Sequence, residues 1–413
     1  MKSTIFYKQC LVYIFFTSIL FLGFYLGEDT AGGAIYDYNI HKKTIEKLFL
    51  NGLTFGLLNY DNFSNSHSPI FIVILNYLTS NNELIGRLIY LFISSLIVIV
   101  FYKSLVLKYK KKIILLFVLS NFFLLSPYFR SYSIWPGDET IALIFLCLSI
   151  YFSIRFIKSE KKSLIFLLLN VISLAAASYL RPIYCIFSIY FLFIFFINDK
   201  FNLRFFILYF ISNIFLAFPA FYYVFILDVN FFSSSLDGFN IINTFTLFFL
   251  TIFFYLTPII FFDFKNIFYK FNLKNFILSI SVTLLVLFFF KYEMSSGGGF
   301  YLKISQFLFK NHILVYILFP VAFYYSNQIL ELNKIKNFIL FLLLIFIEID
   351  GYFFMESYDP LFYMLFFTLF DLNVNKNLDI NLNKRIIYIF IFQIFLLFSK
   401  FYQINFINDF KLI

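Results

Sequence analysis

Residues 28–69, EDTAGGAIYDYNIHKKTIEKLFLNGLTFGLLNYDNFSNSHSP, form the one long polar interval in an otherwise strongly apolar chain. The interval follows directly on the first apolar segment and contains two of the three histidines and several glycines. Glycine suits backbone that turns tightly or approaches a ligand closely. The interval is therefore the first candidate for a functional loop. Its acidic residues are Glu28, Asp29, Asp37, Glu46 and Asp61.

The composition excludes a water-soluble globular protein. Of the 413 residues, 62% are hydrophobic and only 13% are charged, whereas soluble domains are about half apolar and about one quarter charged. The chain is therefore expected to be a polytopic membrane protein. Its net charge of +10 then points to basic cytoplasmic loops rather than to nucleic acid. The three cysteines lie in apolar segments without a metal-site spacing, which predicts packing roles for them.

The pattern of apolar runs predicts an all-α fold with about thirteen transmembrane helices, because each span needs about 20 residues. Residues 1–413 are expected to form a single integral membrane domain. The first run is interpreted as a retained helix, since no convincing small-residue cleavage site follows it. A cytoplasmic N-terminus places most Lys and Arg residues in inner loops. Most acidic residues and all 13 glycines then fall at the outer side.

This topology predicts one large outer loop and three smaller ones. The large loop covers residues 28–80, and the others cover residues 126–140, 291–304 and 356–360. Within the large loop, an apolar stripe over residues 45–53 recurs at helical spacing opposite charged residues, which predicts an amphipathic helix lying on the membrane surface.

Two patterns mark where the helices of the large loop begin. Asp37 stands at the start of the amphipathic helix, where a side-chain oxygen can cap free amide groups. Ser68 and Pro69 predict the cap and first turn of a second short helix that runs to Leu78. The loop is therefore expected to be two surface helices joined by a turn.

The outer face collects carboxylates, a few cations and aromatic side chains close to lipid. In such a site one carboxylate can serve as a general base for an acceptor hydroxyl, while Arg or Lys stabilises a phosphate leaving group. For each charged residue taken singly, the alternative is a solvated or helix-capping role.

The order of residues in the large loop resembles the GT-C superfamily of polytopic glycosyltransferases. Asp37 opens a surface helix after the first span, and His67, Ser68 and Pro69 follow thirty residues later at the start of another short helix. The stretch SPYFRSYSIWPGDETIALIF, residues 126–145, is similar to the second outer loop of that superfamily. Protein O-mannosyltransferases, the aminoarabinose transferase of lipid A and dolichyl-linked mannosyl- and glucosyltransferases look like this over residues 10–160.

The resemblance implies an inverting transfer of a sugar from a polyprenyl-phosphate donor. The acceptor is a glycan, lipid or protein on the extracytoplasmic side, which suggests the plasma membrane of a bacterium and a role in cell-envelope polysaccharide. Asp37 is the expected general base, and Asp29, closer to the first span, is its rival. Asp37 is followed here by Tyr38 rather than by a second acid. The resemblance implies no metal ion or other cofactor besides the lipid-linked donor substrate.

The resemblance and the outer-loop charges together suggest residues that bind the substrates. Arg130 and Arg181 are the candidates for the donor phosphate, and Lys291 and Lys303, which flank a run of three glycines, are the alternatives. His67 matches the basic position before proline and is expected to contact the phosphate or the acceptor. The full set of candidate substrate-binding residues is Glu28, His67, Arg130, Asp138, Glu139, Arg181, Lys291, Lys303, Glu356, Tyr358 and Asp359.

Two other functions fit a polytopic membrane protein. A lipid-linked sugar transporter or flippase usually has repeated halves and ionisable residues near the middle of the membrane, and neither stands out here. A polysaccharide polymerase or O-antigen ligase typically has its large outer loop late in the chain, whereas this loop comes first.

Overall fold

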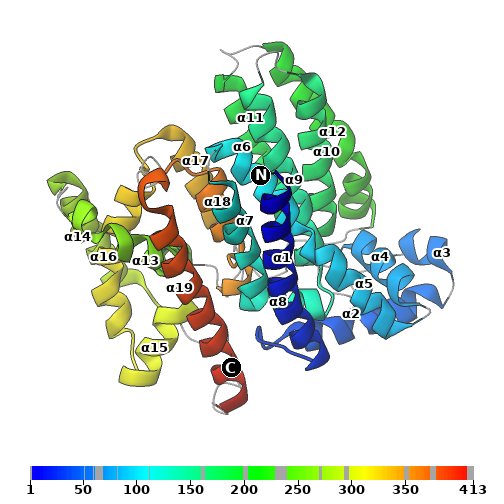
Figure 1. The fold of residues 1–413 in the computed structure, drawn as a ribbon, viewed down its shortest axis with the longest axis horizontal. Helices are drawn as coiled ribbons and strands as arrows, with labels where there is room; N and C mark the ends of the chain where they lie inside the picture. Colours follow the sequence, from blue (N-terminus) through cyan, green and yellow to red (C-terminus); the bar gives the residue numbers. More distant parts are fainter. Residues whose placement is uncertain are drawn as a thin grey trace. The chain divides into compact units, whose positions relative to one another are not determined.

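All regular structure that the computed structural model describes is helical, as the apolar pattern predicts. The chain forms two compact units, unit 1 (Met1–Ser234) and unit 2 (Ser235–Ile413) (Figure 1). The expectation that unit 1 and unit 2 form a single membrane domain stays a prediction. The described residues are 2–50, 52–58, 60, 68–80, 82–110, 112–159, 163–198, 203–227, 240–268, 272–292, 297–347, 353–372 and 378–406.

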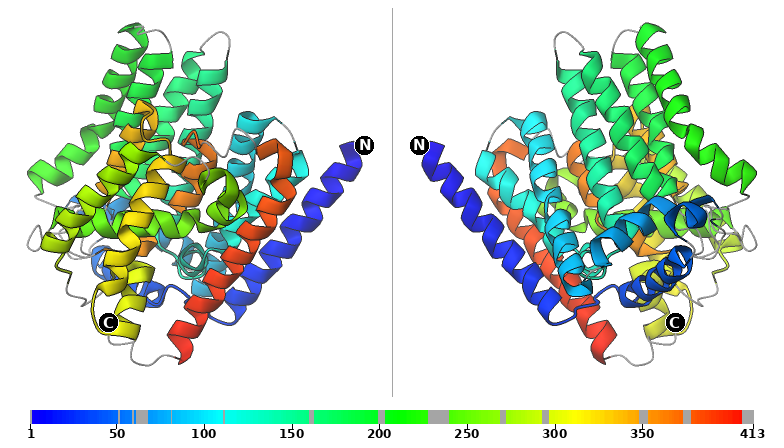
Figure 2. Two further views of the ribbon diagram at one scale, coloured as in Figure 1. Left: turned by 90° about the vertical axis from the view of Figure 1, so that its left-hand side faces the viewer. Right: turned by 90° about the vertical axis from the view of Figure 1, so that its right-hand side faces the viewer.

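Unit 1 has α9 and α10 at its centre. These two helices pack along each other; α9 also packs against α6, and α10 packs against α12 (Figure 2). The elements of unit 1 are α1 (Lys2–Tyr25), α2 (Ala34–Phe49), α3 (Leu53–Leu58), α4 (Pro69–Thr79), α5 (Glu83–Ser95), α6 (Ile97–Tyr109), α7 (Ile113–Asn121), η2 (Phe122–Leu125), α8 (Pro127–Ile134), α9 (Asp138–Lys158), α10 (Leu164–Leu180), η3 (Pro182–Ile186), α11 (Phe187–Asn198), α12 (Leu203–Phe221) and the π-helical turn η4 (Tyr222–Ile226).

The helical path bends sharply between η2 and α8. The segment Ile113–Leu125 and α8 are bent by 66° relative to each other. Pro127 is the cause, because it disfavours helical backbone at Ser126 and leaves no amide to continue the helix. Ser126 instead caps α8 by accepting a hydrogen bond from the Phe129 amide at 3.2 Å. Every residue of α8 is buried, so the stretch 126–140, expected as an outer loop, is largely an interior helix of unit 1.

Unit 2 is built around α13, which packs against α15, α16 and α19, while α14 packs against α16. Part of the abundant phenylalanine is used here: the ring of Phe249 lies 4.7 Å from that of Phe323 and 5.0 Å from that of Phe341. The elements of unit 2 are α13 (Ile241–Phe268), α14 (Leu273–Phe289), α15 (Gly299–Phe309), α16 (Ile313–Ile329), α17 (Ile335–Ile345), η5 (Met355–Ser357), α18 (Leu361–Thr368) and α19 (Leu378–Phe406).

The glycine run in unit 2 starts a helix. Gly297, Gly298 and Gly299 have φ angles of 76°, 85° and 76°, a region that residues with a side chain rarely adopt. A β-carbon on Gly297 would also lie 2.3 Å from the Phe353 carbonyl oxygen. The expected loop 291–304 therefore ends in α15, and Lys303 lies on that helix.

The helix lengths are consistent with an integral membrane protein, but they do not confirm thirteen spans. Among the described residues, six helical segments are long and apolar enough to cross a membrane, and the bent pair around Ser126 would make a seventh. Several expected spans are shorter: α17 has 11 residues, which gives about 16 Å against a hydrocarbon core of about 30 Å. The six segments are Thr4–Tyr25, Glu83–Tyr109, Asp138–Lys158, Leu203–Ile226, Ile241–Ile260 and Leu382–Gln403.

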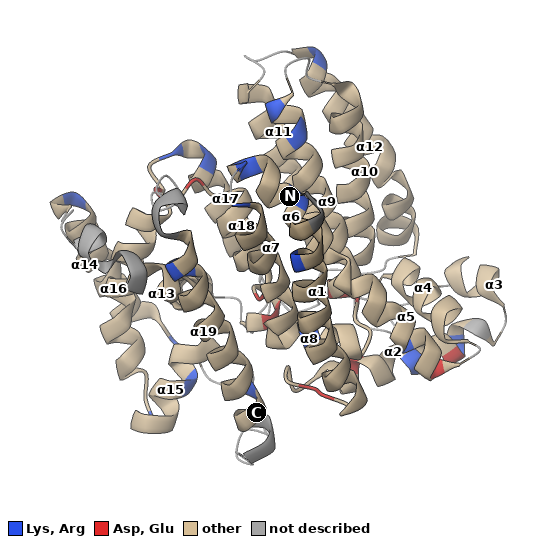
Figure 3. Cartoon of the chain, in the orientation of Figure 1, with Lys and Arg blue, Asp and Glu red and all other residues tan. Residues whose placement is uncertain are grey.

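Charge is distributed unevenly over unit 1. Basic residues gather at the end of the unit where α6 and α9 end, and acidic residues gather at the opposite end, where α9 begins (Figure 3). At the basic end, the Lys158 amine donates to the carbonyls of Leu107 and Lys108. This asymmetry is what the positive-inside rule predicts for the two ends of a membrane bundle; the orientation itself stays a prediction.

Candidate functional site

Glu28 and Arg130 form an ion pair inside the acidic end of unit 1. Arg130 Nε donates to Glu28 Oε1 at 2.7 Å, and Arg130 Nη2 donates to Glu28 Oε2. The rest of the guanidinium is also occupied, because Nη1 donates to the Leu124 carbonyl at 3.1 Å and Nη2 to the Ile19 carbonyl at 3.2 Å. The Arg130 side chain is 3% exposed. Its bonds are therefore those of a structural residue.

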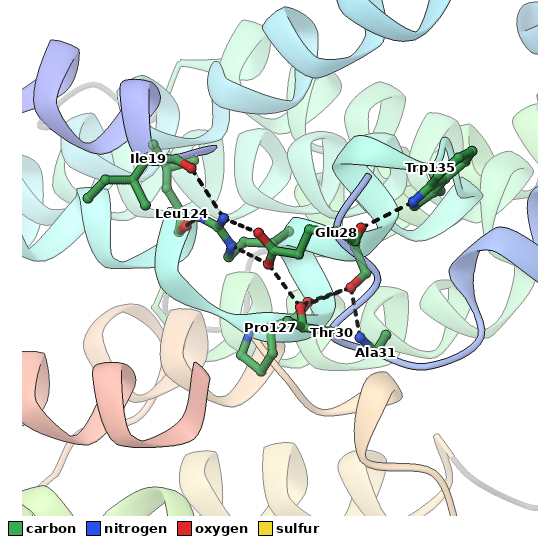
Figure 4. Close-up of polar contacts among 9 residues, drawn as sticks. Ile19, Glu28, Thr30, Ala31, Leu124, Pro127 and Trp135 are labelled. Carbon is green, nitrogen blue, oxygen red and sulfur yellow. Dashed lines mark hydrogen bonds and ion pairs between the residues drawn. The ribbon is translucent and has the colours of Figure 1, made fainter. Parts of the chain in front are cut away.

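The chain that follows Glu28 is bound to α8 by further hydrogen bonds (Figure 4). The Ser131 hydroxyl accepts the Ala31 amide at 2.8 Å, and the Thr30 hydroxyl lies 3.0 Å from the Pro127 carbonyl. Trp135 Nε1 donates to the Glu28 carbonyl at 3.1 Å. These contacts fix the start of the polar loop against α8.

Asp29 caps α2. Its Oδ1 atom accepts the amides of Gly32 at 3.1 Å and Ala34 at 3.3 Å, and its Oδ2 atom accepts the Ile35 amide at 3.3 Å. A carboxylate at this position satisfies amides that the helix itself leaves unpaired. The sequence placed the helix start at Asp37, so the capping role predicted for Asp37 belongs to Asp29.

Asp37 lies in the first turn of α2, where it is half-buried. Its Oδ2 atom accepts a hydrogen bond from the Tyr132 hydroxyl at 3.0 Å. Tyr132 is 4% exposed and belongs to α8. The carboxylate of Asp37 is thus held at the polar end of unit 1 by a buried phenol from a rigid helix.

Arg87 of α5 approaches the same segment. Its Nε atom donates to the Ile134 carbonyl at 3.1 Å, and its Cζ atom lies 3.5 Å from the centre of the Trp135 ring. The Tyr38 ring lies 5.8 Å away. Burial is the largest cause raising the pKa of the Tyr38 hydroxyl, Glu83 raises it further, and the positive charge of Arg87 opposes them.

Arg181 directly follows α10 and forms an ion pair with Glu139 of α9. Its Nη1 atom lies 3.1 Å from Glu139 Oε1, and both side chains are partly exposed. Asp138, next to Glu139, is buried. The hydroxyl of Tyr90 donates to the carbonyl of Gly137, just before this pair. Residues 130–139 therefore contact Glu28, Asp37, Arg87, Tyr90 and Arg181 in order along one short segment.

A groove of about 340 Å³ lies between α4, α10, η3, α11 and α12. Ser68 and Pro182 are part of its lining. The sequence predicts that the Ser68 side chain caps α4, but the structure shows no such bond. The Ser68 hydroxyl instead donates to the Tyr179 carbonyl. The Tyr179 hydroxyl in turn donates to the Leu216 carbonyl at 2.6 Å.

Most side chains that line this groove are apolar, and four of its polar side chains bond to backbone carbonyls. Besides Ser68 and Tyr179, the Ser178 hydroxyl donates to Leu174 O at 2.9 Å and the Asn213 amide donates to Tyr209 O at 2.8 Å. Such satisfied groups do not demand a polar ligand. The groove is suited to an apolar occupant.

The candidate residues of unit 2 form a separate cluster. Tyr358 is fully buried, its ring stacks on Phe353 and Phe362 with centres 5.1 and 4.9 Å apart, and its hydroxyl lies 3.4 Å from Leu344 O. It is a core residue and does not face an open site. Asp359 is also buried, whereas Lys291 is exposed.

Lys303 lies on α15, outside the candidate spans, and its pKa differs from that of a free lysine. Burial lowers the pKa of Lys303 to about 8, Lys400 lowers it as well, and Glu356 opposes them. Lys303, Lys400, Glu356 and Asp359 therefore share one electrostatic environment.

The structure thus divides the sequence-predicted residues between the units. Unit 1 holds Glu28, Asp29, Asp37, Arg130, Asp138, Glu139 and Arg181, and unit 2 holds Lys291, Lys303, Glu356, Tyr358 and Asp359. His67 lies outside the described residues.

Sequence reasoning missed Arg87, Tyr132 and Lys400. A signal existed for Arg87, because it is an ionisable residue inside an expected span, and such a residue is by default a candidate for function. Tyr132 carried no signal among 31 tyrosines. Lys400 follows the last expected span and resembles an ordinary flanking lysine.

Comparison of the chain with protein-family models, with curated proteins and with solved structures found no match. In the described part of the chain, no three His, Cys, Asp or Glu side chains are grouped so that they could hold a metal ion. The GT-C resemblance and the roles that it implies therefore stay predictions.

We expect Glu28→Gln to lower the free energy of unfolding by about 3–5 kcal/mol, because it leaves the charge of Arg130 buried without its partner. The measurement is unfolding of the purified protein in detergent. Glu83→Gln is the control, since it breaks the Lys42 pair whose side chains are 50% and 41% exposed, and it should cost about 0–1 kcal/mol. Equal losses in the two variants would contradict the structural role of Glu28.

We expect stability to rise between pH 7 and pH 9.5 through Lys303. The folded protein releases this proton near pH 8, whereas an unfolded chain keeps it to about pH 10.4. The unfolded state therefore binds more protons in this window, and stability rises with pH. Lys303→Met should flatten this rise, measured as the unfolding temperature at each pH, while loss of the exposed Lys274 should not. An unchanged slope in Lys303→Met would show that Lys303 is not the group responsible.

Proposed function

We propose that this chain is a membrane glycosyltransferase of the GT-C type. In this proposal it transfers a sugar from a polyprenyl-phosphate-linked donor to an acceptor hydroxyl on the extracytoplasmic side of the membrane. The observation that carries it is the position of Asp37: a half-buried carboxylate in the first turn of α2, bonded to Tyr132, at the acidic end of unit 1. The order of loop residues that resembles the superfamily places the base at the same residue.

The neighbouring acids support Asp37 over its rivals. Both oxygens of Asp29 accept amides at the start of α2, and both oxygens of Glu28 bond to Arg130. A general base has to exchange a proton with the substrate, and carboxylates that hold a helix start or a buried cation are committed to the fold. Asp37 accepts the Tyr132 hydroxyl through Oδ2, and a phenol in this position can orient a carboxylate toward a substrate hydroxyl.

The proposed reaction is a single displacement at the anomeric carbon of the sugar. Asp37 takes the proton of the acceptor hydroxyl, and the acceptor oxygen forms a bond to that carbon. The bond from the carbon to the phosphate oxygen breaks, and its electron pair leaves with the polyprenyl phosphate. The anomeric configuration inverts, and the proton on Asp37 passes to water.

The apolar groove supports a lipid-linked donor. It lies beside α12, part of the candidate span Leu203–Ile226, of which only 6% is buried, so one wall of the groove belongs to an outward-facing membrane helix. Pro219 lies inside α12 and η4 follows it, and such irregular backbone opens space next to a helix. The volume falls in the range of about 300–1,000 Å³ typical of ligand pockets. We propose that part of the polyprenyl chain lies here.

Glu139 connects this groove to the polar segment. Arg181 immediately precedes Pro182, which lines the groove, and Arg181 pairs with Glu139. Glu139 is the last residue of the stretch 130–139, and Tyr132 of that stretch contacts Asp37. The proposed lipid and acid sites are therefore joined by one continuous piece of chain in unit 1.

We expect Asp37→Asn to reduce sugar transfer by roughly 10²–10⁴-fold, because the amide cannot take the proton. Its carbonyl can still accept the Tyr132 hydroxyl, so folding should be unaffected. The assay follows a radiolabelled sugar from polyprenyl phosphate to acceptor in proteoliposomes. An unchanged rate would show that Asp37 is not the base.

Asp29→Asn is the matched control for Asp37→Asn. Its one remaining acceptor oxygen can still accept the amides of Gly32 and Ala34, which Oδ1 of Asp29 accepts, so this variant should keep most of the transfer activity. Loss of transfer in Asp29→Asn alone would move the base to Asp29. Movement of the lipid-linked sugar across the bilayer without transfer would favour the flippase alternative.

We expect Ala217→Trp to raise the KM for the lipid donor at least tenfold, which is about 1.4 kcal/mol of binding, because the indole fills the groove. Ala217 lines the groove, whereas Phe215 on the same helix does not and is 77% exposed. Phe215→Trp should therefore leave the KM unchanged. The same KM in both variants would exclude this groove as the lipid site.

A further inference from the structure

Arg87 differs from the other cations of this region in how its guanidinium is used. Arg130 is enclosed by Glu28 and two carbonyls, and Arg181 pairs with Glu139. Arg87 has one protein hydrogen bond, from Nε to the Ile134 carbonyl at 3.1 Å. Among the described residues, its Nη1 and Nη2 atoms have neither a hydrogen-bond acceptor nor an ion-pair partner. The side chain is half-buried.

The plane of this guanidinium is fixed by its surroundings. Trp135 lies 3.5 Å below Cζ, with Phe24 at 5.2 Å and Tyr38 at 5.8 Å. Stacking on an aromatic face holds an arginine in one orientation and leaves its edge available for bonding. Trp135 is itself fixed by its bond to the Glu28 carbonyl. The two terminal amino groups therefore form a preorganised pair of donors.

The charges around Arg87 leave it positive. Glu83, one helical turn earlier, acts on Arg87 through its charge, but Glu83 is already bonded to Lys42 at 2.8 Å. Arg87 is not in a direct ion pair with it. An anion that reaches Nη1 and Nη2 would meet a cation that no carboxylate has neutralised, and a planar fork of donors suits phosphate oxygens.

The position of Arg87 brings this fork close to the proposed base. Arg87 contacts residues 134 and 135, and Asp37 is bonded to Tyr132 two residues earlier in the same segment. Tyr38, against which Arg87 packs, is the neighbour of Asp37 in α2. A sugar phosphate is the kind of substrate that needs both a cation and a carboxylate, and Arg87 and Asp37 contact the same segment, residues 132–135.

We infer that Arg87, held on Trp135, binds the phosphate oxygens of the substrate through Nη1 and Nη2. The identification of that phosphate as part of the lipid-linked donor rests on the proposed function. In that reaction Arg87 would stabilise the charge that develops on the leaving phosphate. The candidates from the sequence, Arg130 and Arg181, would then support the site without contributing its main phosphate contact.

The first test measures binding of decyl phosphate to the purified protein in a neutral detergent. We expect Arg87→Gln to weaken binding at least tenfold. Arg155→Gln is the matched control, because Arg155 also stacks on an aromatic ring, that of Phe166 at 4.4 Å, and bonds to a tyrosine hydroxyl at 3.1 Å, but lies in the last turn of α9. Equal losses in both variants, or no loss in Arg87→Gln, would overturn the inference.

Three ligands define the chemistry of the site. Inorganic phosphate tests the anion without the alkyl chain. If inorganic phosphate binds in an Arg87-dependent way but more weakly than decyl phosphate, the result supports a phosphate site with an adjoining lipid site. Decanoate carries the chain with a carboxylate and should bind more weakly than decyl phosphate. Tighter binding of decanoate would overturn the assignment to phosphate.

A second measurement needs no variant. Phenylglyoxal modifies accessible guanidinium groups, and mass spectrometry of the peptides reports the extent at each arginine. Decyl phosphate should protect Arg87 and leave Arg155 as reactive as before. Equal modification of Arg87 with and without decyl phosphate would overturn the inference even if Arg87→Gln fails to fold.

These experiments also separate the inference from the proposed function. Binding and protection do not require sugar transfer. Arg87-dependent binding in a protein that transfers no sugar would count against the glycosyltransferase alone. Sugar transfer with an unaltered rate and KM in a folded Arg87→Gln variant would count against Arg87 alone.

Discussion

The polar end of unit 1 depends on the buried ion pair between Glu28 and Arg130. A guanidinium that is 3% exposed is tolerated only because each of its nitrogens has an acceptor, and a carboxylate supplies two of them. Close approach of α1 is part of this arrangement, since a β-carbon on Gly23 would lie 2.2 Å from Glu28 Oε2 and 2.5 Å from Arg130 Nη2. The pair therefore joins the end of α1 to α8.

From this pair the rest of the site follows along two short segments. After Glu28, Asp29 sets where α2 begins, and that register brings Asp37 to the first turn. After Arg130, Tyr132 reaches Asp37, Trp135 supports Arg87, and Glu139 meets Arg181. The printed bonds of these charged groups differ: Glu28 and Arg130 neutralise each other, Asp29 accepts amides at the start of α2, and Asp37 accepts the Tyr132 hydroxyl. The apolar groove differs from these segments, because most of its lining side chains are apolar and Ser68, Ser178 and Asn213 bond there to backbone carbonyls.

Unit 2 has a different chemistry. Its core is made largely of stacked aromatic rings around α13 and the residues from Phe353 to Phe362. Lys303, Lys400, Glu356 and Asp359 share one environment there, and such a mutually compensating group of charges is the arrangement expected when ionisable side chains are buried. Of the candidate residues of this unit, Tyr358 belongs to the aromatic core and Asp359 is buried beside it.

The sequence by itself determined the all-helical fold and the membrane-type composition, because hydrophobic content and charge asymmetry are properties of whole segments. It also singled out residues 28–69 and 126–145, and the structure brings described parts of these two stretches into contact. Only the tertiary structure decided which acids and cations neutralise each other. Glu28 and Arg130 are 102 residues apart, and no spacing rule links them. The same holds for Tyr132 with Asp37 and for Arg87 with Trp135, since a contact between distant segments is set by how helices pack.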